Sequence, residues 1–251
     1  MEAILQSRGE FSAKSLKRTN TVRSLGLSAC LALSLTSFAP TWNSQAAFAC
    51  PCESVVAPTN PDTELHIKDG LAFTRTAEYH KQFSQSVDAA KKFVRKYIAE
   101  HPNERQVAVV SDVDETLLDN RPVFEEHPNF VWDDFRSWVT EGSAPTLKDT
   151  AEFLSWARKN GVAILLVTGR FEKERLATTE NLIQKEVSYD ALYMRTLEDT
   201  GSAITYKSAV RKKIHEQGFN VLVNIGDQWS DLLGGGSIDC EKLPNHIYYI
   251  P

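Results

Sequence analysis

Two carboxylates follow directly after a short apolar segment near the middle of the chain. The apolar residues span 107–110, and Asp112, Asp114 and Thr116 come next at spacings of two. Side chains two residues apart on an extended backbone point to the same side, so the two carboxylates repel each other. A hard cation with oxygen ligands, such as Mg²⁺, removes that repulsion. This stretch therefore indicates a metal site at the end of a strand, although a solvated polar turn would have the same residues.

A second group of polar residues follows the next apolar segment, at 162–167. Thr168, Gly169 and Arg170 stand directly behind it. A hydroxyl and free backbone amides at the start of a turn can bind a phosphoryl oxygen. An ordinary turn that Gly169 relaxes would look the same, so this segment carries weight only together with the others.

Two more groups occur later in the chain. Lys207 and Arg211 are four residues apart and share one face of an expected helix. An ammonium group there would offset charge on a nucleophile and on a group in transfer. Asp227 and Asp231 follow another apolar segment, so Asp227 could reach a metal shared with Asp112, with Asp231 supporting it from behind. The alternatives are a solvated surface lysine and an aspartate that only caps a helix.

Helices and short apolar strands alternate along the chain. Strands are expected at residues 107–110, 162–167, 191–194, 221–225 and 247–250; helices are expected at 71–100 (one or two), from a capping box at 146–149 to Gly161, at 171–184 and at 208–217. Residues 120–143 are expected to be an irregular insertion rich in Phe and Trp. The alternation predicts an α/β fold with a parallel sheet covered on both faces. In such sheets sites lie beyond the carboxyl ends of strands, where Asp112, Thr168 and Asp227 fall.

The composition is that of an ordinary globular protein. The chain has 251 residues, of which 42% are hydrophobic and 24% are charged. This length suits one domain of about 200 residues and a leader. Residues 50–251 carry 23 basic and 31 acidic side chains, a net charge of −8. The sequence therefore lacks the basic patch with which proteins bind nucleic-acid polymers.

The N-terminal residues 1–49 have the pattern of a signal peptide. A basic start is followed by an apolar segment at 25–39 and by Ala47-Phe48-Ala49. The apolar segment is shorter than the ~20 residues of a transmembrane helix. We therefore expect no membrane span and export to the periplasm, the cell envelope or the exterior. Because the basic region is long, the true start codon could lie downstream. Residues 50–64 contain three prolines and are expected to form a tether.

The mature chain would keep Cys50, Cys52 and Cys240, whose pairing the sequence leaves open. Cleavage after Ala49 would place Cys50 at the new N-terminus, where a lipid anchor could be attached. The anchor is not favoured, because an aliphatic residue usually stands three positions before a lipid-modified cysteine and Ala47 does not fit well.

Taken in order, the four motifs resemble the haloacid dehalogenase (HAD) superfamily of phosphohydrolases. Residues 112–116 resemble its first motif, Thr168 its second, Lys207 its third, and Gly226-Asp227 with Asp231 its fourth. Further stretches narrow the resemblance to subfamily IIIB, the class C, lipoprotein and plant vegetative-storage-protein group of acid phosphatases. These stretches are Leu71-Ala72, Ala77-Glu78-Tyr79, and residues 114–120, 226–231, 243–245 and 248–251.

The resemblance implies a Rossmann-like three-layer sandwich over residues 65–251. It also implies an N-terminal helical extension and a small cap insertion at about 120–145. We expect the aromatic residues of the insertion to pack among themselves rather than to stack on a substrate. The resemblance leaves a homodimer open.

The resemblance also implies a mechanism. Asp112 would attack phosphorus and form an aspartyl-phosphate, and Asp114 would act as general acid and then general base. Mg²⁺ would be held by Asp112, the backbone carbonyl of Asp114 and Asp227, with Asp231 in support. The phosphate-binding candidates are Thr168, Gly169, Arg170, Lys207 and Arg211. Thr168 and Lys207 are also counted among the catalytic residues.

Three functions fit this pattern. The first is a secreted Mg²⁺-dependent acid phosphatase acting on small phosphomonoesters, with nucleoside 5′-monophosphates as one class of substrate. The second is a non-catalytic storage or phosphate-binding protein of the same fold. The third is a phosphotransferase that passes the phosphate to an alcohol. Some plant storage relatives lack the nucleophile, so the presence of Asp112 favours an active enzyme.

Overall fold

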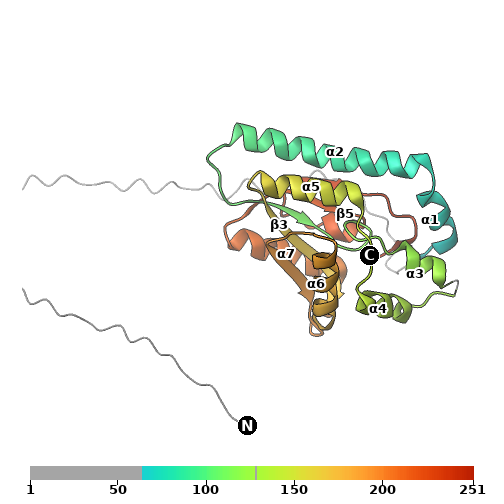
Figure 1. Cartoon of the computed structure of the whole chain (residues 1–251). Helices are drawn as coiled ribbons and strands as arrows, with labels where there is room; N and C mark the ends of the chain where they lie inside the picture. Colours follow the sequence, from blue (N-terminus) through green and yellow to red (C-terminus); the bar gives the residue numbers. More distant parts are fainter. Residues whose placement is uncertain (1–63, 128) are drawn as a thin grey trace, which may run out of the picture. The chain divides into compact units, whose positions relative to one another are not determined.

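The structure is a computed structural model, and it describes residues 64–127 and 129–251 (Figure 1). The expected signal peptide and residues 50–63 of the expected tether lie outside the described residues. Glu64, the last residue assigned to the tether, instead begins strand β1 (Glu64–Leu65). Within the described ranges, no helix combines the length and apolar character needed to cross a membrane.

A five-stranded parallel sheet forms the centre of the described chain, with the strand order β4-β3-β2-β5-β6. The strands are β2 (Val107–Ser111), β3 (Ala163–Phe171), β4 (Ala191–Arg195), β5 (Asn220–Gly226) and β6 (Asp239–Lys242). The expected parallel α/β sheet is confirmed. Strand β6 was missed because its sequence, DCEK, has no apolar run. β2 is the central strand. The first motif, which directly follows β2, therefore lies beside the carboxyl ends of β3 and β5.

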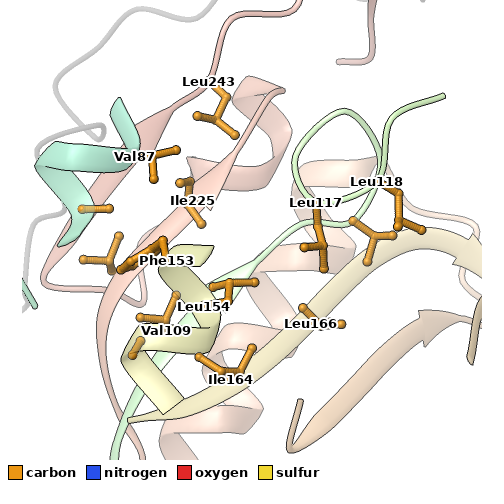
Figure 2. Close-up of a cluster of buried hydrophobic side chains, with 14 of the residues drawn as sticks. Val87, Val109, Leu117, Leu118, Phe153, Leu154, Ile164, Leu166, Ile225 and Leu243 are labelled. Atoms are coloured by element: carbon orange, nitrogen blue, oxygen red, sulfur yellow. The ribbon is translucent and has the colours of Figure 1, made fainter. Parts of the chain in front are cut away.

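Helices cover both faces of this sheet (Figure 1). α2 (Ala77–Glu100) and α5 (Lys148–Lys159) pack on one face, and α7 (Ala203–Glu216) packs on the other with the short α8 (Trp229–Leu232). The strands alternate their side chains accordingly: Val109 and Ile164 join the cluster under α2 and α5. Val110 and Leu165 join the cluster under α7. Figure 2 shows the first cluster, where Phe153 and Leu154 of α5 lie over the strands.

The N-terminal helical part consists of two helices, α1 (Ile67–Thr74) and α2. Arg75 and Thr76 separate them, and Thr76 caps α2, because its side chain accepts a hydrogen bond from the backbone N–H of Tyr79. α2 then buries one stripe of residues at helical spacing: Tyr79, Phe83, Val87, Ala90 and Val94. Burying each large apolar side chain contributes about 1.5–3 kcal/mol, so this stripe fixes α2 on the sheet.

Two local expectations were wrong. Residues 120–143 are largely helical, with α3 (Arg121–Glu126) and α4 (Trp132–Glu141). Pro122 is tolerated because it lies in the first turn of α3, where its missing N–H has no partner to lose. The expected capping box at Thr146 does not form, since Leu147 is the N-cap of α5 without a side-chain cap. Asp149 instead accepts a hydrogen bond from Ser84 Oγ of α2 at 2.7 Å.

The last expected strand is β7 (Tyr248–Tyr249), and it lies outside the parallel sheet. It pairs antiparallel with β1, so that the first and last described segments form a separate two-stranded sheet. This pairing holds the C-terminal segment in place, and its Tyr248 is buried. β3 continues four residues beyond the expected end, and a short 3₁₀ turn (Glu172–Glu174) leads into α6 (Arg175–Gln184).

Candidate active site

Polar side chains from three neighbouring strands meet at the carboxyl edge of the sheet. Asp112 directly follows β2, and Asp227 directly follows β5. A cavity of about 180 Å³ lies at this edge. Its lining includes Asp112, Asp114, Gly169, Arg170, Lys207, Asp227 and Asp231. The structure therefore brings together seven of the nine residues that the sequence singles out, and Thr168 and Arg211 are the two that do not line the cavity.

Lys207 joins two of the aspartates. Its Nζ donates to Asp112 Oδ1 at 2.6 Å and also to Asp231 Oδ1. All three side chains are buried. Burial alone would lower the pKa of Lys207, but the charges of Asp112 and Asp231 outweigh it and raise that pKa, so the ammonium stays charged. Lys207 lies inside α7, which starts at Ala203, five residues earlier than expected.

Three carboxylates form a candidate metal site. One oxygen each of Asp112, Asp227 and Asp231 can be chosen so that all lie within 4.8 Å of one another. Burial, opposed by Lys207 and reinforced by the other carboxylates, raises the pKa of Asp112 well above its usual value. Burial, and then the charge of Asp231, raises the pKa of Asp227 to about 6. Buried, mutually repelling oxygens of this kind fit a hard divalent cation.

The charged side chains around the cavity also favour a bound cation. Five buried or half-buried carboxyl groups meet here, namely Asp112, Asp114, Glu115, Asp227 and Asp231. Three cationic side chains contact them: Arg170 on Asp114, Lys207 on Asp112 and Asp231, and Lys242 on the backbone oxygen of Asp227. Carboxyl groups thus outnumber the cationic side chains in contact with these residues, which favours a bound cation.

Asp227 is oriented by side chains to which the sequence had given no role. Thr116 Oγ1 donates to its Oδ1 at 3.0 Å, and Gln228 Nε2 and Asn245 Nδ2 both donate to its Oδ2 at 2.7 Å. Lys242 Nζ donates to the backbone oxygen of Asp227. Asn245 belongs to the C-terminal segment that pairs with β1, so that segment contributes directly to the site. The sequence signal was present, because residues 226–231 and 243–245 are among the stretches that narrow the family resemblance.

Asp114 is held by the second motif. Arg170 Nη2 and Nε donate to Asp114 Oδ1 at 2.6 and 3.0 Å, and Thr168 Oγ1 donates to Asp114 Oδ2 at 3.4 Å. The ladder between β3 and β4 is interrupted between Val167 and Phe171, which releases the intervening backbone from the sheet. Thr168, Gly169 and Arg170 lie within the bounds of β3, between its two paired parts, rather than starting a turn, and Arg170 contacts the expected general acid.

Arg211 does not reach the cavity. Its Nε donates to the backbone oxygen of Gly235 at 2.6 Å and its Nη1 to that of Asp231 at 2.5 Å, and Nη2 donates to that of Leu233. Arg211 was expected to bind phosphate, but its guanidinium is directed to these backbone oxygens instead. A buried guanidinium with its donors on backbone carbonyls fixes the loop that carries Asp231.

The aromatic side chains of the insertion pack among themselves, as favoured from the sequence. The ring centroids of Phe124 and Phe130 are 4.8 Å apart, and those of Phe130 and Trp132 are 5.5 Å apart. Trp132 and Phe135 also line the cavity, together with Phe171 and Tyr248. The same aromatic side chains thus stabilise the insertion and form an apolar wall beside the charged centre.

The raised pKa of Asp227 predicts how Mg²⁺ affects stability at different pH. Between its reference value of 3.8 and about 6 the folded chain binds the proton that the unfolded chain has lost. In this window the metal-free protein loses stability as the pH rises, by about 3 kcal/mol from this group. A divalent cation at these oxygens would bind the deprotonated form, so the melting temperature should rise more on Mg²⁺ addition at pH 7 than at pH 4.5. Equal increases at both pH values, measured by differential scanning calorimetry, would contradict this.

The sequence of this chain is similar to those of an acid phosphatase and of plant storage proteins and glycoproteins. Acid phosphatase 1 from Solanum lycopersicum is 43% identical over 148 residues, which are 56% of this chain and 58% of the tomato protein. The Stem 28 kDa glycoprotein of Glycine max is 34% identical over 185 residues, 69% of this chain and 70% of that protein. Vegetative storage protein 1 of Arabidopsis thaliana is 30% identical over 200 residues, 75% of this chain and 70% of that protein.

The fold is shared with a solved structure. The class C acid phosphatase from Bacillus anthracis superposes with a TM-score of 0.62 at 19% identity, covering 73% of this chain and 85% of that one. The family profile described as HAD superfamily, subfamily IIIB (acid phosphatase) matches residues 53–251, which include the whole cavity and the four motifs. The chain belongs to the subfamily IIIB acid phosphatases of the HAD superfamily.

Proposed function

We propose that the protein is an exported, Mg²⁺-dependent acid phosphatase that hydrolyses phosphomonoesters through an aspartyl-phosphate on Asp112. The observation that carries the proposal is the buried contact between Lys207 Nζ and Asp112 Oδ1, 2.6 Å long, within the cluster of Asp112, Asp227 and Asp231. A lysine fixed on a carboxylate at the end of a central strand suits nucleophilic attack on a phosphoryl group.

The proposed reaction has two steps. Asp112 forms a bond to phosphorus while the bond from phosphorus to the leaving oxygen breaks, and Asp114 gives that oxygen a proton. A water molecule then attacks the aspartyl-phosphate, Asp114 accepts the proton from the water, and inorganic phosphate leaves. Asp114 thus acts first as a proton donor and then as a proton acceptor.

The carboxylates fit a hard divalent ion, which would be held by Asp112, the backbone oxygen of Asp114 and Asp227. Mg²⁺ bound there supplies positive charge between the carboxylate nucleophile and the anionic substrate. Asp231 is proposed to support this set, because it contacts both Lys207 and the backbone N–H of Gln228, the residue that follows Asp227.

Gly169 and Lys207, which line the cavity, are proposed to hold the phosphate oxygens, whereas the buried hydroxyl of Thr168 contacts Asp114 and the backbone N–H of Arg170. A Cβ placed on Gly169 would meet no atom within 4 Å, which leaves its backbone open to a ligand in the cavity that it lines. Lys207 adds the charge that stabilises the equatorial oxygens in the transition state. Arg170 is assigned to Asp114 instead, since its guanidinium contacts that carboxylate.

The proposed substrates carry an aromatic ring on the leaving group. Trp132, Phe135, Phe171 and Tyr248 line the cavity beside the charged centre. Such a wall can stack on a ring, and nucleoside 5′-monophosphates are one class of phosphomonoesters that carry a ring.

Two observations support export, one from the sequence and one from the structure. Residues 1–49 have the signal-peptide pattern, and Cys240 on β6 is disulfide-bonded. Disulfides persist in oxidising compartments outside the cytosol. Among the relatives, the soybean protein is named a glycoprotein.

A non-catalytic storage protein is the second candidate, because vegetative storage proteins are among the relatives. Removal of the metal distinguishes the two functions. The purified mature protein should release p-nitrophenol from p-nitrophenyl phosphate at acid pH with Mg²⁺, and a chelator should reduce the rate at least ~100-fold in a reversible manner. An absence of release with Mg²⁺ would favour storage, and a new phosphate ester after addition of an alcohol would reveal phosphotransfer.

A further inference from the structure

Asn120 lies between the cap insertion and the proposed general acid. It stands directly before α3, and its side chain is fully buried, with a relative exposure of 0%. Its Nδ2 donates to Asp114 Oδ1 at 3.0 Å, and its Oδ1 accepts a hydrogen bond from Trp138 Nε1 at 2.9 Å. The amide thus bridges a helix of the cap and a carboxylate of the cavity.

The indole of Trp138 determines which way the amide points. An indole N–H can only donate, so the atom facing Trp138 must be the amide oxygen. The amide nitrogen then has to face Asp114, where an acceptor is available. Without Trp138 Nε1, rotation of the amide by 180° would place its oxygen against a carboxylate oxygen.

The backbone of Asn120 is fixed independently of its side chain. Its N–H donates to Glu115 Oε1 at 2.9 Å, and Glu115 in turn accepts a hydrogen bond from the hydroxyl of Tyr248. The backbone oxygen of Asn120 accepts a hydrogen bond from the N–H of Val123 at 3.1 Å. A change in the side chain of Asn120 or Trp138 therefore alters the bridge to Asp114 without removing these anchors.

The bridge distinguishes the two oxygens of Asp114. Oδ1 accepts from Asn120 Nδ2 at 3.0 Å and from Arg170 Nη2 and Nε at 2.6 and 3.0 Å. Oδ2 has only longer contacts, 3.2 Å from Arg170 Nε and 3.4 Å from Thr168 Oγ1. With Oδ1 filled by donors, Oδ2 is the atom left to hold the proton that the leaving group receives.

We propose that Asn120 is a positioning residue that orients Asp114 Oδ2 toward the leaving group and ties this orientation to helix α4 through Trp138. α4 also carries Trp132 and Phe135, which line the cavity. Contact of the leaving group with α4 would thus act on the same helix that fixes the proton donor. This inference rests on the proposed phosphatase mechanism.

Two substrates with different leaving groups test the bridge. p-Nitrophenolate leaves without a proton, whereas the alkoxide of β-glycerol phosphate needs one, so the ratio of their kcat/KM values reports proton donation. Trp138→Phe removes the indole N–H together with part of the ring system, and Asn120→Leu removes both hydrogen bonds of the amide. Trp156→Phe, on α5 outside the cavity, is the matched control for a half-buried tryptophan.

The ratio of kcat/KM for β-glycerol phosphate to that for p-nitrophenyl phosphate should fall ~3-fold in Trp138→Phe. It should fall ~10-fold or more in Asn120→Leu and stay within ~2-fold in Trp156→Phe. A Trp138→Phe ratio equal to the Trp156→Phe ratio, in a protein that melts as the wild type does, would overturn the inference.

Asp114→Asn, measured alongside, separates this inference from the mechanism beneath it. If Asp114→Asn lowers the ratio and Trp138→Phe does not, only the role of Asn120 fails. If Asp114→Asn also leaves the ratio unchanged, the general-acid assignment fails with it.

Discussion

Asp112→Asn is expected to leave the protein folded and to lower kcat by more than ~10⁴-fold. An amide cannot form the bond to phosphorus that starts the proposed reaction. The fold should tolerate the change because the amide oxygen can still accept the hydrogen bond from Lys207 that Asp112 Oδ1 accepts. Lys207 keeps Asp231 as an ionised partner, so the free energy of unfolding should fall by less than the ~3–5 kcal/mol that it costs to leave a buried charge unpaired. Steady-state kinetics and urea unfolding measure the two effects.

Asp88→Asn on the exposed side of α2 is the matched control and should keep full activity. Hydrolysis by Asp112→Asn at a rate near that of the wild type would remove Asp112 as the nucleophile. Loss of folding in Asp112→Asn would instead show that its carboxylate has a structural role that the Lys207 contact does not reveal.

Lys207→Met should impair both catalysis and folding. Methionine fills a similar volume but leaves Asp112 and Asp231 buried without the ammonium between them. Removing one partner of a buried ion pair typically costs about 3–5 kcal/mol, and the transition state loses its lysine as well. We expect a lower free energy of unfolding, and a kcat reduced at least ~10³-fold under conditions where the variant remains folded.

Mg²⁺ should restore part of the stability of Lys207→Met, because it places positive charge beside the same carboxylates. Lys212→Met, exposed on the same helix, controls for the loss of a lysine from α7. If Lys207→Met unfolds at the same urea concentration as Lys212→Met and hydrolyses substrate equally well, then Lys207 is not part of the charged centre.

The sequence sufficed to predict Asp112 and Asp227 as site residues, because their position at one edge of the sheet does not depend on the order of the strands. Asp112 and Asp227 each directly follow a buried strand, and any parallel arrangement of β2 and β5 brings those ends to one edge. Periodicity also located α2 and β5 within a few residues. These features depend on local patterns, which a sequence displays directly.

The parts that the sequence did not predict depend on long-range contacts. Asn245 reaches Asp227 only because β7 pairs with β1, at the other end of the described chain. Arg211 shares a helix face with Lys207, but the loop carrying Gly235 passes over it and takes up its donors. The polar strand β6 has no periodic signal, since it lies at the edge of the sheet. In each case tertiary contacts decided the outcome.

The central claim is that a carboxylate of this chain becomes bonded to phosphorus, and chemical trapping tests it most directly. The protein is mixed with p-nitrophenyl phosphate and Mg²⁺, quenched in acid and reduced with borohydride, which converts an aspartyl-phosphate to homoserine. Peptide mass spectrometry should then find homoserine at position 112, and none in a sample without substrate. Unmodified aspartate at position 112 during active turnover, or trapped phosphate on another residue, would contradict the account.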